Sequence, residues 1–343
     1  MARLRIVLVG EDAAGIQALR TVARAGHDIV AVMASPSRRG AIGATLWQAA
    51  QRLGYPTWPA ACVKDPSSAV RLRELGVDLL LNVHSLFMIH PEVVSAPRLG
   101  SFNLHPGPLP RYAGLNAVSW ALSRGERIHG VTLHHMDAGC DTGPIAGQTL
   151  FTVEADESAL SVSARCVRFG LDLVAGLLRQ AADDPGAIPA QPQDLAAREY
   201  FGAGPPEGGV FSWNRPARDV VNLIRACDYA PYPSPWGPVR AGHDGRELSL
   251  LKAFATGCVA PEPPGTVGLD LGTGVVVACG DEWIIVRQVG IEGRCVDAGL
   301  VLRQGDRLDE RLTVERGSLR PAPTEEGPAL SSTPSATVYR SAA

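Results

Sequence analysis

The sequence offers no cysteine framework. Its 343 residues include seven scattered cysteines, an odd number, and no two of them form a C-x-x-C pair. This usage argues against a disulfide scaffold or a zinc cage and is typical of reduced thiols in a cytoplasm. No stretch approaches the roughly 18 apolar residues of a membrane span, and the apolar run before Glu11 is too short for a signal peptide. We therefore expect a soluble, cytoplasmic protein without a membrane partner.

An excess of basic residues is also missing. The chain has 32 Lys and Arg against 35 Asp and Glu, which gives a formal net charge of −3. Such a balance provides no overall basic footprint for nucleic acid. The apolar fraction of 45% and the charged fraction of 20% are ordinary for a globular protein. The length suffices for two domains with sizeable cores.

Several common functional motifs are absent. The "GEDAAG" stretch at 10–15 is neither G-x-G-x-x-G nor a Walker loop, so a plain strand-to-helix turn is favoured there. Neither G-x-S-x-G nor H-E-x-x-H occurs. His134 and His135 are adjacent on an expected strand and so point to opposite faces. We therefore expect one core-facing and one exposed histidine, and no metal site.

β-prone and helical segments alternate through the first half of the chain. Strands are expected at 4–9, 28–34, 77–83, 100–105 and 130–136, and helices at 14–25, 44–54, 68–76 and 157–182. This alternation predicts an α/β fold with a Rossmann-like, mostly parallel sheet flanked by helices. Sites in such sheets lie beyond the carboxyl ends of the strands.

The long helix at 157–182 is expected to close the first domain. Its predicted core face repeats at steps of four and three and comprises Leu160, Ala164, Val167, Leu171, Val174 and Leu178. Polar and proline-rich sequence at 183–193 then ends the helix. We therefore place a catalytic domain at 1–190 and an irregular linker at 191–210.

A second, smaller domain is expected at 211–315. Asn214 suits a helix N-cap and Pro216 the first turn. Short β-prone runs separated by glycine-rich turns follow, which favours a small antiparallel, OB-like β-barrel. Residues 316–343 are rich in Pro, Ser, Thr and Ala and are predicted to be a disordered tail.

Polar side chains gather where two expected strands end. Asn103 and His105 share one face of the strand at 100–105, because side chains alternate with period two. Asp137 and Asp141 lie in the glycine-rich loop that follows the strand at 130–136. Such a loop can bring a carboxylate close to an imidazole or a ligand, although a β-turn with Asx bonds explains it equally well.

An amide, an imidazole and a carboxylate together suit acyl transfer to an amine. The amide N–H can stabilise a developing oxyanion, and the imidazole can donate to that oxygen or move a proton. The carboxylate can orient the imidazole and take up the proton that the attacking amine loses. Because the amine itself attacks, no protein nucleophile is required.

"FNLHPGPLPRYAG" followed by "HHMDAGCDTG" closely resembles the 10-formyltetrahydrofolate-dependent formyltransferase family, whose hallmark is Asn-x-His-Pro and a later Asp-Thr-Gly loop. The resemblance covers about residues 3–311. It implies that Asn103, His105 and Asp141 are the catalytic trio, with Asn103 and a protonated His105 steadying the oxyanion. Asp141 would hold His105 and help to remove the ammonium proton.

The resemblance also implies where the substrates bind. The co-substrate would be 10-formyltetrahydrofolate, held at its pterin edge mainly by backbone groups, and no metal is implied. The residues assigned to it are Leu86, Phe87, Met88, Ile89, Asp137, Gly139 and Cys140. Tyr112 and Asn116 are expected to line the acceptor pocket, whereas Trp120 is better explained as helix core. Asn116 stands where many relatives have proline.

The acceptor is expected to be a small-molecule amine, either an amino sugar or an amino acid or other amine of secondary metabolism. The stretch 225–240, "RACDYAPYPSPWGPVR", resembles the same region of the enzymes that act on metabolites.

Methionyl-tRNA formyltransferase is the alternative, but the loop at 34–43 has only Arg38 and Arg39, whereas tRNA binding uses many phosphate contacts. A 10-formyltetrahydrofolate hydrolase and a non-catalytic folate-binding protein also stay open, although the intact trio argues against the latter. The C-terminal domain could pair two copies of the chain.

Overall fold

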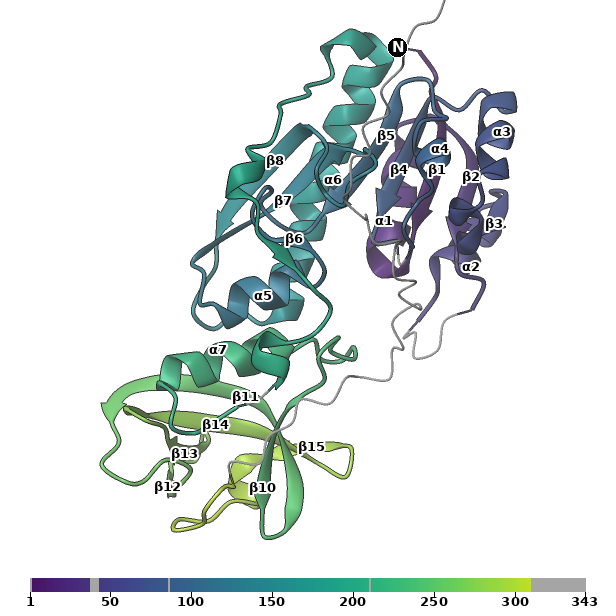
Figure 1. Ribbon diagram of the computed structural model, residues 1–343. Helices are drawn as coiled ribbons and strands as arrows, with labels where there is room; N and C mark the ends of the chain where they lie inside the picture. Colours follow the sequence, from purple (N-terminus) through teal and green to yellow (C-terminus); the bar gives the residue numbers. More distant parts are fainter. Residues whose placement is uncertain (1, 38–42, 86, 210, 310–343) are drawn as a thin grey trace, which may run out of the picture.

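Figure 1 shows an N-terminal α/β part and a smaller C-terminal part rich in strands, with helix α7 between them. This computed structural model describes residues 2–37, 43–85, 87–209 and 211–309. The predictions for Arg38, Arg39, Leu86 and the tail at 316–343 fall outside the described residues. Within the described ranges, no helix is both long and apolar enough to cross a membrane.

A seven-stranded sheet forms the N-terminal part, in the order β3-β2-β1-β4-β5-β7-β8. The strands are β1 (Arg5–Gly10), β2 (Asp28–Ala34), β3 (Thr57–Pro59), β4 (Leu79–Val83), β5 (Gly100–His105), β7 (Ile128–His135) and β8 (Ile145–Thr152). β1 to β5 run parallel, whereas β7 and β8 are antiparallel to their neighbours. The predicted Rossmann-like, mostly parallel sheet is confirmed.

Helices cover both faces of this sheet. α1 (Asp12–Arg24), α2 (Leu46–Arg52) and α6 (Ala159–Asp183) pack on one face, and η1 (Ala60–Lys64), α3 (Ser67–Glu74) and α4 (Pro91–Val94) pack on the other. The strands supply apolar residues to both sides: Ile6 and Leu8 join the first core and Val7 and Val9 the second. Such continuous apolar strands are typical of a sheet that is buried on both faces.

The buried face of α6 overlaps the predicted one but is shifted from it. Val174 and Leu178 are buried and Val167 and Leu171 pack against the same core, whereas Ala164 is exposed. The buried face also includes Gly170, where an added Cβ would lie 2.7 Å from the side chain of Leu104 on β5. This close approach to the sheet at glycine, which a periodic count of large apolar residues does not detect, sets the rotation of the helix.

The predicted linker at 191–210 packs against the N-terminal domain. It contains η3 (Leu195–Ala197), β9 (Tyr200–Phe201) and η4 (Pro206–Gly209), and η2 (Pro185–Ala187) precedes it. β9 pairs in parallel with β6 (Ala113–Gly114), just before α5 (Ala117–Ser123). The linker therefore adds a short strand beside the loop that follows β5.

The C-terminal part is a barrel-like antiparallel domain, as predicted. Its strands are β10 (Val239–His243), β11 (Arg246–Val259), β12 (Val267–Asp270), β13 (Val275–Ala278), β14 (Glu282–Ile291) and β15 (Arg294–Asp297), and η5 (Ala298–Leu300) follows them. After η5 the chain makes isolated bridges from Asp309 to Gly242 and from Arg307 to Thr266. The final described segment thus connects the two outer strands of the sheet order, β10 and β12.

Helix α7 (Ala217–Cys227) joins the two parts by packing between α5 and the strands β11 and β14. The prediction of Asn214 as its N-cap is wrong, because Pro216 occupies that position. A proline side chain cannot cap an N–H group, and the carboxylate of Asp281 accepts from the amide of Ala217 at 2.7 Å instead. The cap comes from a residue distant in sequence, which no local pattern could indicate.

Candidate active site

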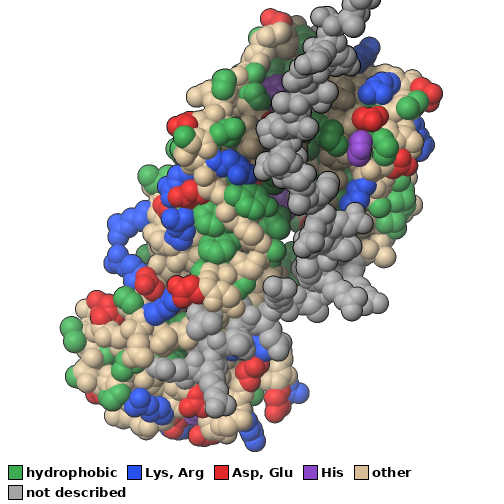
Figure 2. Space-filling view, in the orientation of Figure 1, with side chains coloured by type: hydrophobic (Ala, Val, Ile, Leu, Met, Phe, Trp, Pro, Cys, Tyr) green, Lys and Arg blue, Asp and Glu red, His purple; other side chains and the backbone are tan. Residues whose placement is uncertain are grey.

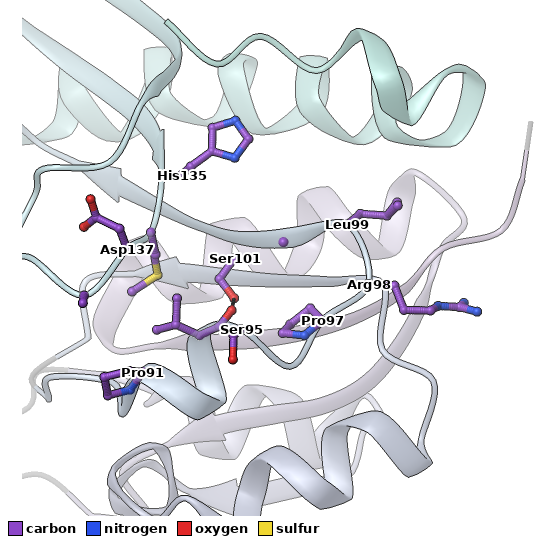
Figure 3. A pocket seen from close by; sticks show the side chains of 12 residues that line it. Pro91, Ser95, Pro97, Arg98, Leu99, Ser101, His135 and Asp137 are labelled. Atoms are coloured by element: carbon purple, nitrogen blue, oxygen red, sulfur yellow. Dashed lines mark hydrogen bonds between the residues drawn. The ribbon is translucent and has the colours of Figure 1, made fainter. Parts of the chain in front are cut away.

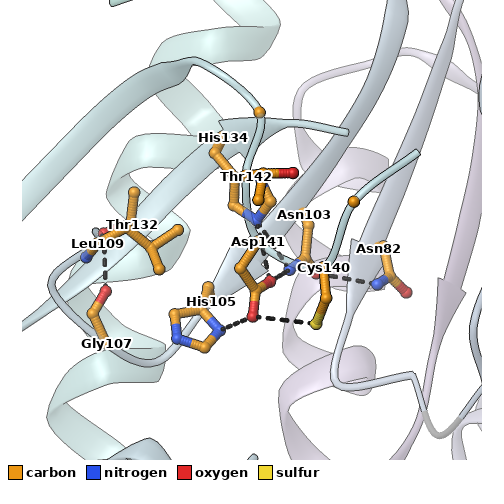
Figure 4. Close-up of polar contacts among 12 residues, drawn as sticks. Asn82, Asn103, His105, Gly107, Leu109, Thr132, His134, Cys140, Asp141 and Thr142 are labelled. Atoms are coloured by element: carbon orange, nitrogen blue, oxygen red, sulfur yellow. Dashed lines mark hydrogen bonds and ion pairs between the residues drawn. The ribbon is translucent and has the colours of Figure 1, made fainter. Parts of the chain in front are cut away.

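Three polar side chains stand next to one another across the middle of the sheet. In the strand register, Asn103 on β5 lies opposite Asn82 on β4 and opposite His134 on β7. The Nδ2 atom of Asn82 donates to Oδ1 of Asn103 at 2.9 Å, and Nδ2 of Asn103 lies 3.1 Å from Nε2 of His134. Figure 4 shows this row beside His105 and Asp141.

Asp141 reaches this row from the loop between β7 and β8. Its backbone has a left-handed φ of 56°, which orients the carboxylate toward β5. Oδ1 accepts from Nδ2 of Asn103 at 3.2 Å, and Oδ2 accepts from the amide of Gly114 at 2.9 Å. Oδ2 also lies 3.5 Å from Nδ1 of His105. The structure thus brings together Asn103, His105 and Asp141.

The carboxylate of Asp141 is held in its charged form. Burial by itself raises the pKa of Asp141, but His105, His134 and the amide of Gly114 together more than offset it. The pKa of this carboxyl group therefore lies well below its usual range. A buried, permanently charged carboxylate is a strong acceptor for nearby N–H groups.

His105 is 4% exposed. Its hydrogen-bond partner determines which ring nitrogen carries the hydrogen. Its Nε2 atom lies 2.7 Å from the carbonyl oxygen of Tyr112, which can only accept, so Nε2 carries the hydrogen. Burial lowers the pKa of His105 below its ordinary 6.5 and outweighs the opposing effect of Asp141. This direction favours a neutral ring in the resting site, with Nδ1 facing Asp141, and the expected role of a protonated His105 at the oxyanion stays a prediction.

The side chain of Tyr112, which is predicted to help line the acceptor pocket, points away from the trio, and its predicted substrate role stays untested. Tyr112 is 1% exposed, and its hydroxyl donates to Glu126 at 2.7 Å, away from the trio. Only its backbone carbonyl reaches the site. The amide of Asn116, half-buried, donates to the carbonyl of Ala203 at 2.8 Å, which leaves its predicted substrate role untested.

Sequence reasoning missed His134, which was expected to be a core or surface histidine. Its side chain is 3% exposed, and Nε2 lies 3.4 Å from Oδ1 of Asp141 as well as against Asn103. The prediction that neighbouring histidines face opposite sides holds, since His135 contacts the ring of Phe102 and the carbonyl of Pro189. Only the register of β5 with β7 reveals which of the two faces the site.

A cavity of about 460 Å³ opens between α4 and the beginning of β5 and is shown in Figure 3. Its walls come from α4, from the beginning of β5 and from Met136, Asp137 and Ala138, which begin the loop that carries Asp141. Asn103, His105 and Asp141 do not line it. The volume falls within the usual range for small-molecule pockets.

The residues assigned to the co-substrate have different environments. Ile89 is buried and Phe87 packs against the same core, whereas Met88 is 65% exposed. Asp137 accepts from the amide of Gly139 at 3.0 Å and from the hydroxyl of Thr142 at 2.7 Å, so its carboxylate shapes the loop. Asp137 also lines the cavity.

Cys140 directly precedes Asp141, and its Sγ atom lies 3.7 Å from Oδ2 of that carboxylate. Burial, together with the Asp141 charge, raises the pKa of this thiol to about 11. Cys140 is therefore a neutral neighbour of Asp141 rather than a nucleophile.

The linker fixes the outer side of the same loop. Nε2 of Gln193 donates to the carbonyl oxygens of Asp141 and Gly143 at 3.0 and 2.6 Å. Nη2 of Arg198 donates to the carbonyl of Cys140 at 2.9 Å. The position of Asp141 thus depends on residues about 50 positions later, which the motif itself does not include.

Comparison with known proteins identifies the family. Residues 5–175 match the formyl transferase model, and residues 205–299 match that of the formyl transferase C-terminal domain. The chain belongs to the formyl transferase family. It is accordingly an enzyme that transfers a formyl group, and the resemblance drawn from the sequence motifs is confirmed.

Relatives of this formyl transferase cover nearly its whole described length. A methionyl-tRNA formyltransferase of Anaeromyxobacter dehalogenans is 31% identical over 312 residues, which cover 89% of this chain and 97% of that protein. One from Geobacter metallireducens is 29% identical and covers 86% and 93%. The crystal structure of a Helicobacter canadensis N-formyltransferase with folinic acid and dTDP-3-aminofucose is 16% identical, with a TM-score of 0.62 and coverage of 82% and 98%. This last likeness shows a shared fold.

Proposed function

We propose that this enzyme transfers the formyl group of 10-formyltetrahydrofolate to the amine of a small-molecule acceptor. The observation that carries the proposal is the contact of the charged, buried Asp141 with both Asn103 and His105. This arrangement provides a donor for a developing oxyanion and a base for the proton of an attacking amine. It contains no activated serine or cysteine, which agrees with direct attack by the amine.

The residues act in a defined order. Asn103 donates an N–H to the formyl oxygen as negative charge develops there while the amine nitrogen bonds to the formyl carbon. Nδ1 of His105 takes the proton that the amine loses, because its other nitrogen is already committed to the carbonyl of Tyr112. Asp141 stabilises the resulting imidazolium. His105 then returns the proton to N10 of the folate as the bond between N10 and the formyl carbon breaks.

The cavity at the beginning of β5, which shares with Asp141 the loop that starts at Met136, is the proposed site for the pterin end of the folate. Apolar side chains such as Val94 and Met136 suit the faces of a flat ring, and the loop backbone at 136–138 can pair with polar atoms at its edge. The backbone of Phe87 and Ile89 would complete the site from the neighbouring loop. Gly139 and Cys140 keep Asp141 adjacent to the reactive end.

The charge distribution favours a small acceptor over tRNA. Figure 2 shows acidic and basic side chains interspersed over the visible face. The arginines next to the Tyr112 loop are paired, Arg111 with Glu126 at 2.6 Å and Arg124 with Glu199 at 3.0 Å. Paired arginines release few counterions and contribute little to phosphate binding. Initiator methionyl-tRNA stays the second candidate, because the curated relatives carry that name.

An acceptor screen tests the proposal. The enzyme is incubated with 10-formyltetrahydrofolate and a panel of nucleotide-linked amino sugars, amino acids and charged initiator tRNA, and products are read by the mass gain of one formyl unit. We expect a small amine to react at a rate that changes little with salt. Formylation of tRNA that weakens steeply with salt would establish the second candidate. Formate release at full rate without an amine would indicate a hydrolase.

The role of Asn103 is tested separately. Asn103→Ala is expected to lower turnover by about 10²–10³-fold, the usual effect of losing one oxyanion donor. Binding of the folate, measured by calorimetry, is expected to be preserved. Unchanged turnover in this variant would contradict the mechanism.

A further inference from the structure

The carboxamide of Asn103 uses all its hydrogen-bonding groups in the resting site. Its Oδ1 accepts from Nδ2 of Asn82 at 2.9 Å. Its two N–H groups face Oδ1 of Asp141 at 3.2 Å and Nε2 of His134 at 3.1 Å. Catalysis requires that an N–H, not the oxygen, faces the reacting formyl group. The orientation of this one amide is therefore a condition for activity.

Asn82 cannot set that orientation. Rotating both carboxamides by half a turn keeps a hydrogen bond between them, now from Nδ2 of Asn103 to Oδ1 of Asn82. In the observed arrangement, Oδ1 of Asn82 is buried and has no hydrogen-bond partner among the described residues. A buried acceptor without a partner is unfavourable, so this pair alone does not favour the active orientation.

Asp141 favours the active orientation, but its carboxylate has other partners. It accepts from the amide of Gly114 and faces Nδ1 of His105. Once a formyl oxygen takes the N–H that Asn103 directs at Asp141, that contact no longer holds the amide. A second acceptor that persists through the reaction is needed.

His134 has the properties of such an acceptor. Its Nδ1 lies 2.8 Å from the carbonyl oxygen of His135, which can only accept, so Nδ1 carries the hydrogen of the neutral ring. Nε2 of this tautomer has a lone pair that accepts from an N–H of Asn103 at 3.1 Å. Oδ1 of Asp141 lies 3.4 Å from Nε2 and, in this tautomer, accepts from Nδ2 of Asn103 rather than from His134. The backbone of β7 thus determines the tautomer of His134, and the tautomer determines the orientation of Asn103.

We propose that His134 is a positioning residue that locks the Asn103 carboxamide with its N–H groups toward the reacting formyl group. The inference rests on the proposed function, because it takes Asn103 as the oxyanion donor. It assigns a role to a residue outside the trio. His134 acts through Asn103 and need not touch either substrate.

The test compares three substitutions of His134. His134→Leu and His134→Met both remove the hydrogen-bond acceptor, and Met does so with an unbranched side chain. His134→Gln can place a carbonyl oxygen near the position of Nε2. We expect His134→Leu and His134→Met to lower kcat about tenfold. This loss is smaller than the about 10²–10³-fold loss of kcat expected when an oxyanion donor is removed, because Asn103 is still present. The KM for 10-formyltetrahydrofolate should change by less than about twofold, because His134 is proposed to act in the chemical step and not in substrate binding. Gln should recover most of the lost kcat.

A double-mutant cycle with Asn103→Ala provides the decisive readout. If His134 acts through Asn103, His134→Leu should have little further effect in the Asn103→Ala background. Rates are measured as tetrahydrofolate release from 10-formyltetrahydrofolate, with the best amine of the panel and with water alone. Thermal unfolding checks that each variant is folded, and Met replaces Leu in the cycle if Leu is not.

The outcomes separate this inference from the proposed function. Wild-type kcat in the Leu and Met variants, or losses that multiply with that of Asn103→Ala, would overturn the role of His134 alone. An active Asn103→Ala enzyme would instead overturn the oxyanion mechanism itself. Equal losses of kcat in His134→Gln and His134→Leu would show that the hydrogen-bond acceptor of residue 134 does not determine the activity, and would overturn the role of His134.

Discussion

At the scale of single residues, the active site depends on backbone groups as much as on side chains. The carbonyl of Tyr112 fixes the hydrogen on His105, and the amide of Gly114 fixes one oxygen of Asp141. A sequence motif, which specifies side chains, indicates neither of these backbone contributions. Tyr112 illustrates the difference, because its side chain points to Glu126 while its backbone serves the site.

A tyrosine substitution separates these two contributions. Tyr112→Phe removes the hydroxyl that donates to Glu126 but keeps the backbone carbonyl. We expect a loss of about 1 kcal/mol in the free energy of unfolding, typical of one hydrogen bond, because Arg111 still pairs with Glu126. The KM for the acceptor should be unchanged. A large rise in that KM, with stability preserved, would support Tyr112 as a substrate-binding residue.

At the scale of elements, the site is held between a hairpin loop and a strand from the linker. β6 and β9 pair through Gly114, where an added Cβ would lie 2.3 Å from the carbonyl oxygen of Phe201. The backbone of Gly114 also has a φ of +94°, which L side chains rarely adopt. The linker and the Asp141 carboxylate are therefore coupled through one glycine.

Gly114→Ala should disrupt both contacts. We expect it to destabilise the protein by about 1–3 kcal/mol, the usual range for overpacking and backbone strain. Formyl transfer should fall further than stability predicts, because the amide moves away from Asp141. Gly202→Ala is the matched control, since an added Cβ there meets nothing within 4 Å. Equal behaviour of the two variants in urea unfolding and turnover would refute the coupling.

The sequence predicted some elements and could not predict others, for physical reasons. The sequence predicts β5 to the residue, because a β-prone run from Gly100 to His105 is ended by the prolines that follow it. The convergence of Asn103 and His105 followed from their period of two. The role of His134 depends on an antiparallel neighbour and its register, and that of Gln193 on a contact across about 50 residues. Local patterns carry no information about such pairings.

At the scale of the whole molecule, buried histidines link folding to pH. His129 is fully buried, and Nε2 lies 3.0 Å from the carbonyl of Pro106. Burial lowers its pKa from 6.5 to about 4. Between these two pH values the unfolded chain binds more protons than the folded chain, so stability falls as the pH falls. The lowered pKa of His105 acts in the same direction.

Urea unfolding between pH 7 and pH 4 tests this linkage. We expect His129 to contribute a loss of about 3 kcal/mol on acidification to pH 4, at about 1.4 kcal/mol per pKa unit. His129→Gln can still donate to the carbonyl of Pro106 but does not titrate, so its stability should fall less steeply over this range. A variant with the same slope as the wild type would exclude His129 as the source.

The antiparallel return of β7 beside β5 has a consequence for how such an enzyme can diversify. Asp141 lies on a hairpin loop rather than on a crossover that must also deliver a helix to the sheet. Hairpin loops accept insertions and deletions without rearranging the strands on either side. Evolution, or an engineer, can therefore reshape the outer part of this loop to suit a new amine, provided that Gln193 and Arg198 still hold the backbone around Asp141, while the strand that carries Asn103 and His105 stays as it is.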